Sequence, residues 1–322
     1  MADSPQASRR SQWLGYAACA LAGCLWGTGF YWGRLALDEM SVEHMVLFRF
    51  AFACLGMAPL LLFGRHRVRF TRGETITLLI SATFGVPVQF LLQFHGLALT
   101  TVSHAALMVG AMPVLLAAAA ALFAGERLDS VGWLALFAST TGAALIVMGG
   151  GRTPAGRDQP SLIGDLLVVA SLFTALAWIL LSKKLMETHS PPVVTAYTIL
   201  SGSVMLAACV LGPWLLSPWT HSHAGPPPLA HVSALAWTAL AMSGLFCTAL
   251  TTFLWNWGIH HVPASRAGVF LNVEPALGSI LGVELLGERL GRFAWLGGAL
   301  ILAAAVTLTL RRHEPEPAVI LE

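Results

Sequence analysis

The sequence is poor in charge: 11% of its 322 residues are Asp, Glu, Lys or Arg, whereas 56% are hydrophobic. A soluble domain carries about 25% charged residues, so this composition excludes an ordinary soluble fold and indicates a membrane protein. The net charge is only +2, and no basic cluster alternates with aromatic residues. A nucleic-acid partner is therefore not expected, whereas the lipid bilayer is.

Cysteine is scarce, and motifs for catalysis or cofactor binding are absent. The five cysteines lie in apolar runs, which favours small buried side chains over disulfides or metal ligands. No H-E-x-x-H, G-x-S-x-G, Walker or dinucleotide-binding motif occurs, so we expect no enzyme, no cofactor and no metal. His221 and His223 have a spacing that can bind metal, but with His231 they fit a solvated loop better, because no Cys or acid joins them.

Long apolar runs dominate the rest of the chain. A helix that spans the hydrocarbon core needs about 20 mostly apolar residues, and turn or charge signals separate the runs. We therefore expect an all-α membrane protein with ten transmembrane helices between disordered polar tails at residues 1–12 and 311–322. The ten runs are residues 13–33, 44–63, 75–98, 102–123, 131–149, 163–182, 192–216, 233–257, 264–286 and 293–310.

The chain carries an internal duplication. Pro113 aligns with Pro275 at an offset of 162 residues, and Gly125-Glu126-Arg127-Leu128 aligns with Gly287-Glu288-Arg289-Leu290 at the same offset. The ungapped match runs from Gly96 to Trp133, which predicts two repeats, at residues 13–149 and 163–310. Because five helices per repeat is an odd number, the repeats would cross the membrane in opposite senses, as two inverted five-helix repeats.

Positive charge predicts the orientation. With a cytoplasmic N-terminus, 12 Lys and Arg residues fall inside and 5 fall outside, and Arg49 lies within the membrane. Cytoplasmic loops carry an excess of these residues, so both termini are expected in the cytoplasm. The expected location is a bacterial-type inner membrane.

These features resemble EamA-type members of the drug/metabolite transporter superfamily. The resemblance is carried by Trp26-Gly27, by Phe48-Arg49-Phe50 and by the two blocks that pair a proline with Gly-Glu-Arg-Leu, and it covers residues 13–310. It implies secondary transport, often the export of amino acids or other small metabolites. One branch of the family exports aromatic amino acids.

Glu274 is the acidic residue predicted nearest to mid-membrane. It lies roughly ten residues from either end of the run at 264–286, a depth at which a carboxylate should be protonated or paired. One interpretation is a site for a proton or a substrate amine. The other is that Glu274 satisfies backbone freed by Pro275. Asn272 lies about 200° from Glu274 on an ideal helix, so both could face one cavity only if the helix is distorted.

Arg49 is a second buried charge, about two turns inside the run at 44–63. It needs a partner, which could be Glu43, Asp38 or the carboxylate of a substrate. The remaining candidates are aromatic, amide and imidazole side chains predicted to line a central cavity for a small amphipathic ligand. Each tryptophan could instead anchor the protein at the membrane interface. These candidates are Trp26, Gln89, Gln93, His95, Trp178, Trp255 and Asn256.

The sequence therefore predicts a secondary transporter that exports amino acids, aromatic or large apolar ones among them, or related small metabolites across the inner membrane by alternating access. An inward permease or a drug exporter of the same fold is the alternative, and a polytopic membrane enzyme is less favoured. The substrate, the direction of flux, ion coupling and the oligomeric state are left open.

Overall fold

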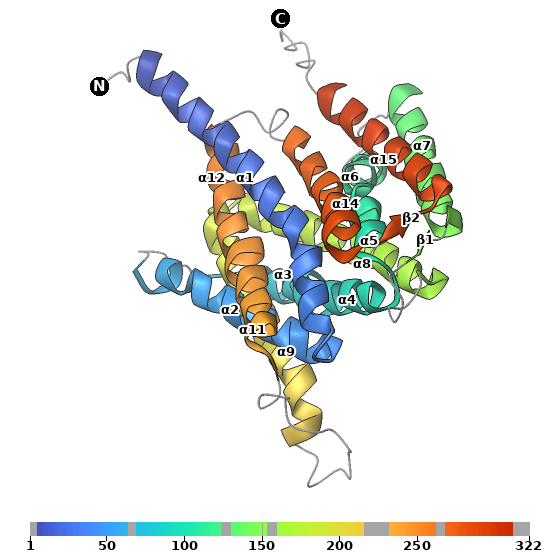
Figure 1. Ribbon diagram of the computed structural model, residues 1–322. Coiled ribbons are helices and arrows are strands. Elements are labelled where there is room, and N and C mark those ends of the chain that lie inside the picture. The colour runs from blue at the N-terminus through green and yellow to red at the C-terminus, as the bar shows by residue number, and fades with distance from the viewer. Residues whose placement is uncertain are drawn as a thin grey trace, which may run out of the picture.

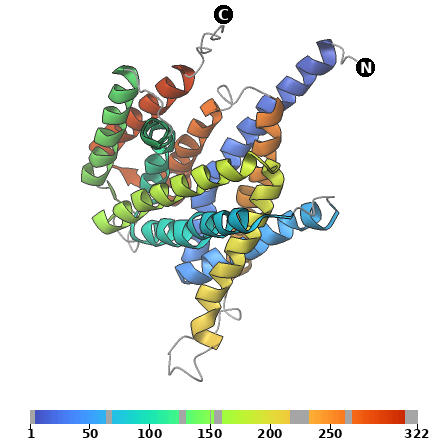
Figure 2. The ribbon, with the colours of Figure 1, turned by 180° about the vertical axis from the view of Figure 1, so that it is seen from behind.

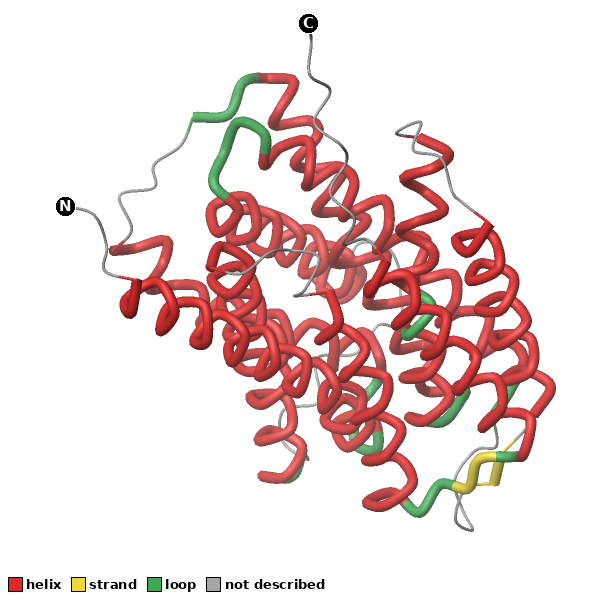
Figure 3. The backbone as a smooth tube through the Cα atoms, turned by 90° about the horizontal axis from the view of Figure 1, so that it is seen from above, coloured by secondary structure: helices red, strands yellow, loops and turns green. Residues whose placement is uncertain are grey.

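The computed structural model describes residues 5–63, 69–123, 130–149, 151–152, 160–215, 232–261 and 268–311. Helices make up nearly all of this part of the chain, and one small two-stranded sheet lies at an edge of the molecule (Figure 3). The start of α1 (Pro5–Leu37) and the end of α15 (Arg292–Arg311) lie toward the same end of the molecule (Figure 1). The fold is thus helical, as predicted.

A helical segment lies over each of the ten apolar runs. The other helices of the first half are α2 (Val42–Phe63), α3 (Arg72–Thr83), α4 (Gln89–Leu99), α5 (Val102–Val109), α6 (Met112–Phe123) and α7 (Ser130–Gly149). Those of the second half are α8 (Leu162–Met186), α9 (Pro191–Leu215), α11 (Ala234–Ala241), α12 (Thr251–His261) and α14 (Val273–Leu286).

Within the described residues, six helical stretches are long and apolar enough to cross a membrane, and Val102–Leu115 and Arg292–Thr307 are shorter apolar helices. Their outward surfaces carry exposed leucine, phenylalanine and tryptophan, which suits contact with lipid. The six stretches are Val42–Pro59, Arg72–Leu99, Ser130–Met148, Leu162–Met186, Pro191–Leu215 and Ala234–Gly258.

Two stretches contain wide helical turns. The π-helix η1 (Phe84–Val88) joins α3 to α4, and the π-helix η2 (Met242–Leu250) joins α11 to α12. Phe84 and Phe246 are separated by the 162-residue offset of the duplication, so the two irregular stretches occupy matching places in the sequence. Single π-helical turns occur mostly inside α-helices and often at functional sites.

The run at 264–286 is interrupted, which corrects the expected continuous helix. Its described part begins with the 3-10 helix η3 (Gly268–Asn272), and α14 starts at Val273. Glu274 is therefore in the first turn of α14 rather than in the middle of a long helix. Pro275 follows within that turn, where its missing N–H costs no hydrogen bond, so the proline helps to start a helix instead of kinking one.

The matching run at 102–123 is interrupted at the corresponding place. It forms α5 and α6, with Gly110 and Ala111 between them, and Pro113 is the second residue of α6. The N-terminal segment is a second correction: α1 already begins at Pro5, whereas the sequence predicted a disordered tail through residue 12.

Close packing of small residues holds the helices together. A Cβ atom on Gly142 of α7 would lie 2.6 Å from the backbone oxygen of Gly297 in α15, so these helices touch through their backbones. The strands β1 (Gly151–Arg152) and β2 (Arg289–Leu290) pair antiparallel beside this contact. Such close approach is a main source of helix association where lipid competes for apolar surface. Figure 2 shows α7 and α15 side by side from the opposite direction.

Candidate functional site

Arg49 lies at the centre of the candidate site. It projects from α2, is only 5% exposed, and donates a hydrogen bond from Nε to Thr248 Oγ1 of η2 over 3.2 Å. Its guanidinium lies 5.0 Å from the ring centre of Phe90 and 5.2 Å from that of Phe94, both on α4. Stacking on aromatic faces stabilises a cation that has left water.

The prediction that Glu43 or Asp38 pairs with Arg49 is wrong. Glu43 lies 3.2 Å from His95, and Asp38 lies 3.5 Å from Arg34. Among the described residues, no carboxylate lies within 4.0 Å of Arg49, and its two terminal nitrogens make no hydrogen bond. Nη2 lies 3.9 Å from the position that a Cβ atom would take on Gly29 of α1. Four guanidinium N–H groups thus remain for another partner.

Glu274 is the acid that shares this region. Its side chain is half-buried at the start of α14, and it interacts electrostatically with Arg49 without forming a direct ion pair. Cys247 lies close to Arg49, because its Cβ and Arg49 Nη2 lie 3.7 and 3.9 Å from the position that a Cβ atom would take on Gly29, and its thiol lies 3.2 Å from the Thr28 hydroxyl of α1. A guanidinium and a carboxyl group from opposite halves of the chain therefore lie in one region without direct contact.

Helix α1 fixes the position of Glu274. A Cβ atom on Gly27 would lie 3.0 Å from the Glu274 backbone oxygen and 2.9 Å from Leu277 Cβ. Only glycine allows this approach, so α1 and α14 meet backbone to backbone at the site. Gly27 is therefore a contact point between the two halves.

The predicted tryptophans divide into two groups. Trp26 of α1 and Trp255 of α12 are half-buried and pack together, with ring centres 5.5 Å apart. Trp178 of α8 instead packs against η1, where a Cβ atom on Gly85 would meet its indole ring at 2.5 Å. The structure thus brings two of the three predicted tryptophans together.

The predicted polar side chains are more scattered. Gln93 is 9% exposed, and Gln89 Oε1 is buried without a hydrogen-bond partner in the described part of the chain. Asn256 donates to Thr195 Oγ1 over 3.3 Å. Asn272, at the end of η3, is also buried. These amides do not form one connected group.

His95 does not belong to a buried site, because its side chain is 46% exposed beside Glu43. It lies on α4, one residue beyond Phe94, and so points away from the face that covers Arg49. The sequence missed five residues of the site, and only the spacing of Phe90 and Phe94, one helical turn apart, could have indicated an aromatic face. The missed residues are Thr28, Phe90, Phe94, Cys247 and Thr248.

Two other carboxylates are structural. Glu288 is 5% exposed and accepts hydrogen bonds at 2.8 Å from the backbone N–H groups of both Val102 and Ser103. It thereby caps the N-terminus of α5 from the other half of the chain. Asp165 accepts a 2.5 Å hydrogen bond from Thr100 and lies 3.5 Å from His104. Both acids are engaged at helix ends.

An apolar cavity of about 400 Å³ lies between α2 and η2, separate from the charged residues. It is open to the outside, and neither Arg49 nor Glu274 lines it. No group of three or more His, Cys, Asp or Glu side chains in the described residues could hold a metal ion, and His221 to His231 lie outside those residues. The cavity is lined by Gly56, Met57, Pro59, Leu245, Ala249, Leu250 and Phe253.

Comparisons with known proteins place this geometry in a family. The model of the EamA-like transporter family matches residues 13–148 and again residues 162–310. An uncharacterized transporter of Archaeoglobus fulgidus is 22% identical over 92% of this chain and 97% of its own length. A biotin transporter of Salmonella typhimurium is 24% identical over 88% of each chain.

A crystal structure of a protein that is 18% identical covers 95% of this chain and 99% of its own, with a TM-score of 0.60. At that identity the likeness concerns the fold alone. The two family matches together cover most of the chain, and both full-length relatives are transporters by name.

Proposed function

Because the chain belongs to the EamA-like transporter family, we propose that it is a secondary transporter for amino acids or closely related small zwitterions. It is a multi-pass membrane protein, and its relatives point to transport rather than enzymatic turnover. The proposed direction is export across a bacterial-type inner membrane, with both termini in the cytoplasm.

The proposal rests on the positions of Arg49 and Glu274, which lie in one region without pairing directly. A buried cation and a nearby acid that do not pair directly are costly unless a ligand engages them. An amino acid presents a carboxylate, which the free N–H groups of Arg49 can bind, and an ammonium, which Glu274 can accept. The substrate would complete an electrostatic network that the protein leaves open.

The aromatic surroundings favour a large apolar side chain on the substrate. Trp26 and Trp255 form one paired surface, and Phe90 and Phe94 cover Arg49. Aromatic rings pack well against aromatic and branched substrates, whereas the polar end of such a substrate needs fixed donors and acceptors. This combination supports aromatic or large apolar amino acids over sugars.

Alternating access is supported by matching features in the two halves. At the offset of 162 the π-helix η1 (Phe84–Val88) falls on Phe246–Leu250, within η2, and both proline-containing runs are interrupted at corresponding places. Interrupted helices near the repeat interface form the substrate sites of many transporters built from inverted repeats. We propose that the halves are such repeats and rock around the Arg49–Glu274 region.

Two contacts between the halves are suited to close opposite ends of the pathway. In the first, Glu39, between α1 and α2, accepts hydrogen bonds from Ser233 N at 2.6 Å and Ser233 Oγ at 2.5 Å. Ser233 is the N-cap of α11. These two bonds hold the pKa of the Glu39 carboxyl below its ordinary value. We call this contact the Glu39 latch.

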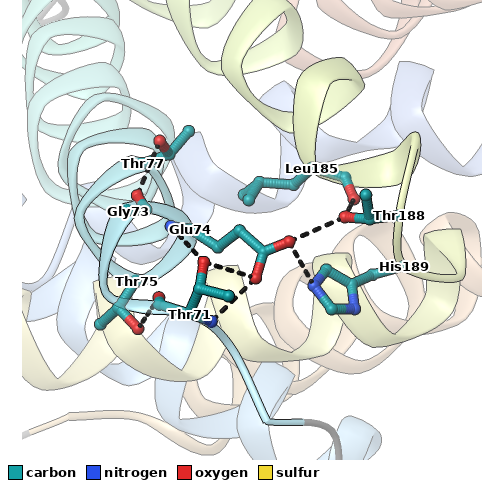
Figure 4. A network of polar contacts seen from close by, with 8 residues as sticks. All are labelled: Thr71, Gly73, Glu74, Thr75, Thr77, Leu185, Thr188 and His189. Carbon is teal, nitrogen blue, oxygen red and sulfur yellow. Dashed lines mark hydrogen bonds and ion pairs between the residues drawn. The ribbon is translucent and has the colours of Figure 1, made fainter.

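The second contact joins the corresponding helix start, that of α3, to the turn between α8 and α9 of the other half (Figure 4). Glu74 of α3 forms a capping box with Thr71 and accepts a 3.0 Å hydrogen bond from Thr188, while His189 lies 3.1 Å away. Thr71 and Ser233 differ by the 162-residue offset. In the proposed topology this Glu74 latch faces the cytoplasm and the Glu39 latch faces outward, so opening either end would require the release of one latch.

Solute counterflow in proteoliposomes tests the proposed function. Vesicles that contain purified protein are preloaded with one unlabelled solute, and uptake of the same solute in labelled form is followed over time. We expect protein-dependent uptake with aromatic or large apolar amino acids, and none with sugars or nucleosides. Uptake with sugars or nucleosides alone would contradict the proposal.

Biotin belongs in the same panel, because a relative 24% identical to this chain is named a biotin transporter. Biotin has a carboxylate for Arg49 but no amine for Glu274. Counterflow of biotin without counterflow of amino acids would assign the site to carboxylates and remove the proposed role of Glu274.

A further inference from the structure

We propose that Thr248 is a positioning residue that holds the Arg49 guanidinium so that its free edge faces the carboxylate of the substrate. This assignment deepens the proposed function and rests on it for the identity of the substrate. Thr248 would not contact the substrate itself. It would act through Arg49.

The hydrogen bond between the two residues is buried at both ends. Arg49 is 5% exposed, Thr248 is 8% exposed, and Nε lies 3.2 Å from Oγ1. The guanidinium can only donate, so Thr248 must accept. A hydroxyl that accepts here must direct its own hydrogen to another atom.

The π-helix provides that other acceptor. Thr248 Oγ1 donates to the backbone oxygen of Ser243 over 3.0 Å, five residues earlier in the chain. In a regular α-helix a threonine hydroxyl reaches the carbonyl three or four residues back, so the wider turn of η2 determines this partner. With its hydrogen committed to Ser243, the oxygen presents its lone pairs to Arg49.

The aromatic rings restrict the same guanidinium from another direction. Phe90 and Phe94 lie 5.0 and 5.2 Å from its central carbon, and Thr248 holds Nε. One of five N–H groups is thus occupied, while the four on the terminal nitrogens share a planar fork that matches a carboxylate. Fixing the guanidinium in advance lowers the entropy lost when a carboxylate binds.

The corresponding helix contact, between α9 and η1, lacks such a positioned guanidinium. Gly244 of η2 packs against the backbone of Arg49 in α2, and Gly202 of α9 packs against η1, where a Cβ atom on Gly202 would lie 2.5 Å from Val86 Cβ. Val86 stands 162 residues before Thr248 and has no hydroxyl. A positioned guanidinium therefore occurs at the contact between α2 and η2 and not at the contact between α9 and η1. The site thus has a single anion-binding side, which would hold a polar substrate in one orientation.

Thr251, the residue that directly follows the same π-helix at the start of α12, provides a matched control. Its hydroxyl also donates to a carbonyl five residues back, that of Phe246, over 2.5 Å. It is fully buried and makes no hydrogen bond with Arg49. A role of Thr248 in stabilising the π-helix alone would be shared by Thr251, whereas a positioning role would not.

The first measurement follows Arg49 directly, without any substrate. Protein labelled with ¹⁵N-arginine gives an Nε–H signal for Arg49, identified by its loss in Arg49→Gln. We expect Thr248→Val to shift this signal and speed its exchange with solvent. Thr248→Ser, which keeps the hydroxyl, and Thr251→Val should leave the signal in place. An unchanged signal in Thr248→Val, or an equal change in Thr251→Val, would overturn the positioning role.

The second measurement compares two ligands of purified protein by titration calorimetry. Phenylalanine has both charged groups, and phenethylamine lacks the carboxylate. We expect Thr248→Val to weaken phenylalanine about tenfold, the effect of one hydrogen bond to a charged group, and to leave phenethylamine unchanged. Thr248→Ser should restore the affinity for phenylalanine.

Equal weakening of both ligands by Thr248→Val would contradict the positioning role, since it would indicate general damage to the site. Failure of the parent protein to bind either ligand would contradict the proposed substrate class. The Arg49 signal would still decide the role of Thr248 in that case, so the two proposals fail separately.

Discussion

Replacement of Arg49 by methionine should separate binding from stability. Methionine is unbranched and packs well against aromatic rings, so Arg49→Met keeps the contact with Phe90 and Phe94 and removes only the charge. The variant loses the hydrogen bond of a charged group to Thr248, about 1.5–3 kcal/mol, and stacking of a cation on two rings, about 0.5–2 kcal/mol.

The free energy gained by removing the buried charge is larger than these losses. A cation without a direct acidic partner costs several kcal/mol to bury, and replacement of buried charges by apolar groups is often neutral or stabilising by about 1–4 kcal/mol. Thr248 keeps its hydrogen bond to Ser243, so no hydroxyl hydrogen is left without an acceptor. We therefore expect Arg49→Met to be as stable as the parent or more stable, and to lose about tenfold or more in affinity for an amino acid.

Thermal unfolding in detergent and titration with phenylalanine measure the two effects. Arg34→Met is the matched control, because Arg34 donates to the Leu97 backbone oxygen over 3.2 Å and lies beside Asp38. That variant should lose about 1–3 kcal/mol of stability, since a carbonyl loses its partner, without a change in affinity. A clear loss of stability in Arg49→Met with unchanged affinity would refute the assignment of Arg49 to substrate.

Three further predictions concern packing, pH and topology. Gly278→Val should abolish transport and lower the free energy of unfolding by about 1–3 kcal/mol, because a Cβ atom there would lie 2.6 Å from Ala106 Cβ. Gly212→Ala should be tolerated, since the space around Gly212 is open, and equal behaviour of the two variants would contradict the packing argument. Because the pKa of Glu39 is lowered in the folded protein, the Glu39 latch stabilises the fold at pH values above the ordinary pKa of 4.5, and this stabilisation is lost as the pH falls through the folded pKa. In Glu39→Gln the melting temperature should therefore depend less on pH from pH 7 downward through that range. An unchanged pH profile would count against the latch. Single cysteines in a cysteine-free version should react with an impermeant reagent in intact cells at residues 221–231 and not at 65–72, and the reverse pattern would invert the proposed orientation.

Much of the fold could be predicted from the sequence, because a bilayer demands long apolar helices and a duplication is visible as matching residues. The interruption before α14 could not be located, since Pro275 is compatible both with a kink and with the first turn of a new helix. The choice depends on η3 and on the packing of Gly27 against α14, which are properties of the folded chain.

The two charged residues of the candidate site could be identified because charge within an apolar run is rare. The residues that surround them could not be identified from the sequence. Thr248 and Cys247 look like ordinary small residues of an apolar helix, and only the wide turns of η2 bring Thr248 to Arg49. His95 is close to Gln93 in the sequence, but two residues along a helix are a rotation of about 200°, which places His95 on the exposed face.

Binding of three related ligands to two charge variants tests the central claim most directly. The ligands are phenylalanine, 3-phenylpropionate, which lacks the amine, and phenethylamine, which lacks the carboxylate. Titration calorimetry gives their affinities for the parent, Arg49→Gln and Glu274→Gln. We expect Arg49→Gln to weaken the two carboxylates and spare phenethylamine, and Glu274→Gln to weaken the two amines and spare 3-phenylpropionate. If each variant weakens all three ligands equally, or none, then no zwitterion bridges Arg49 and Glu274, and the account is wrong.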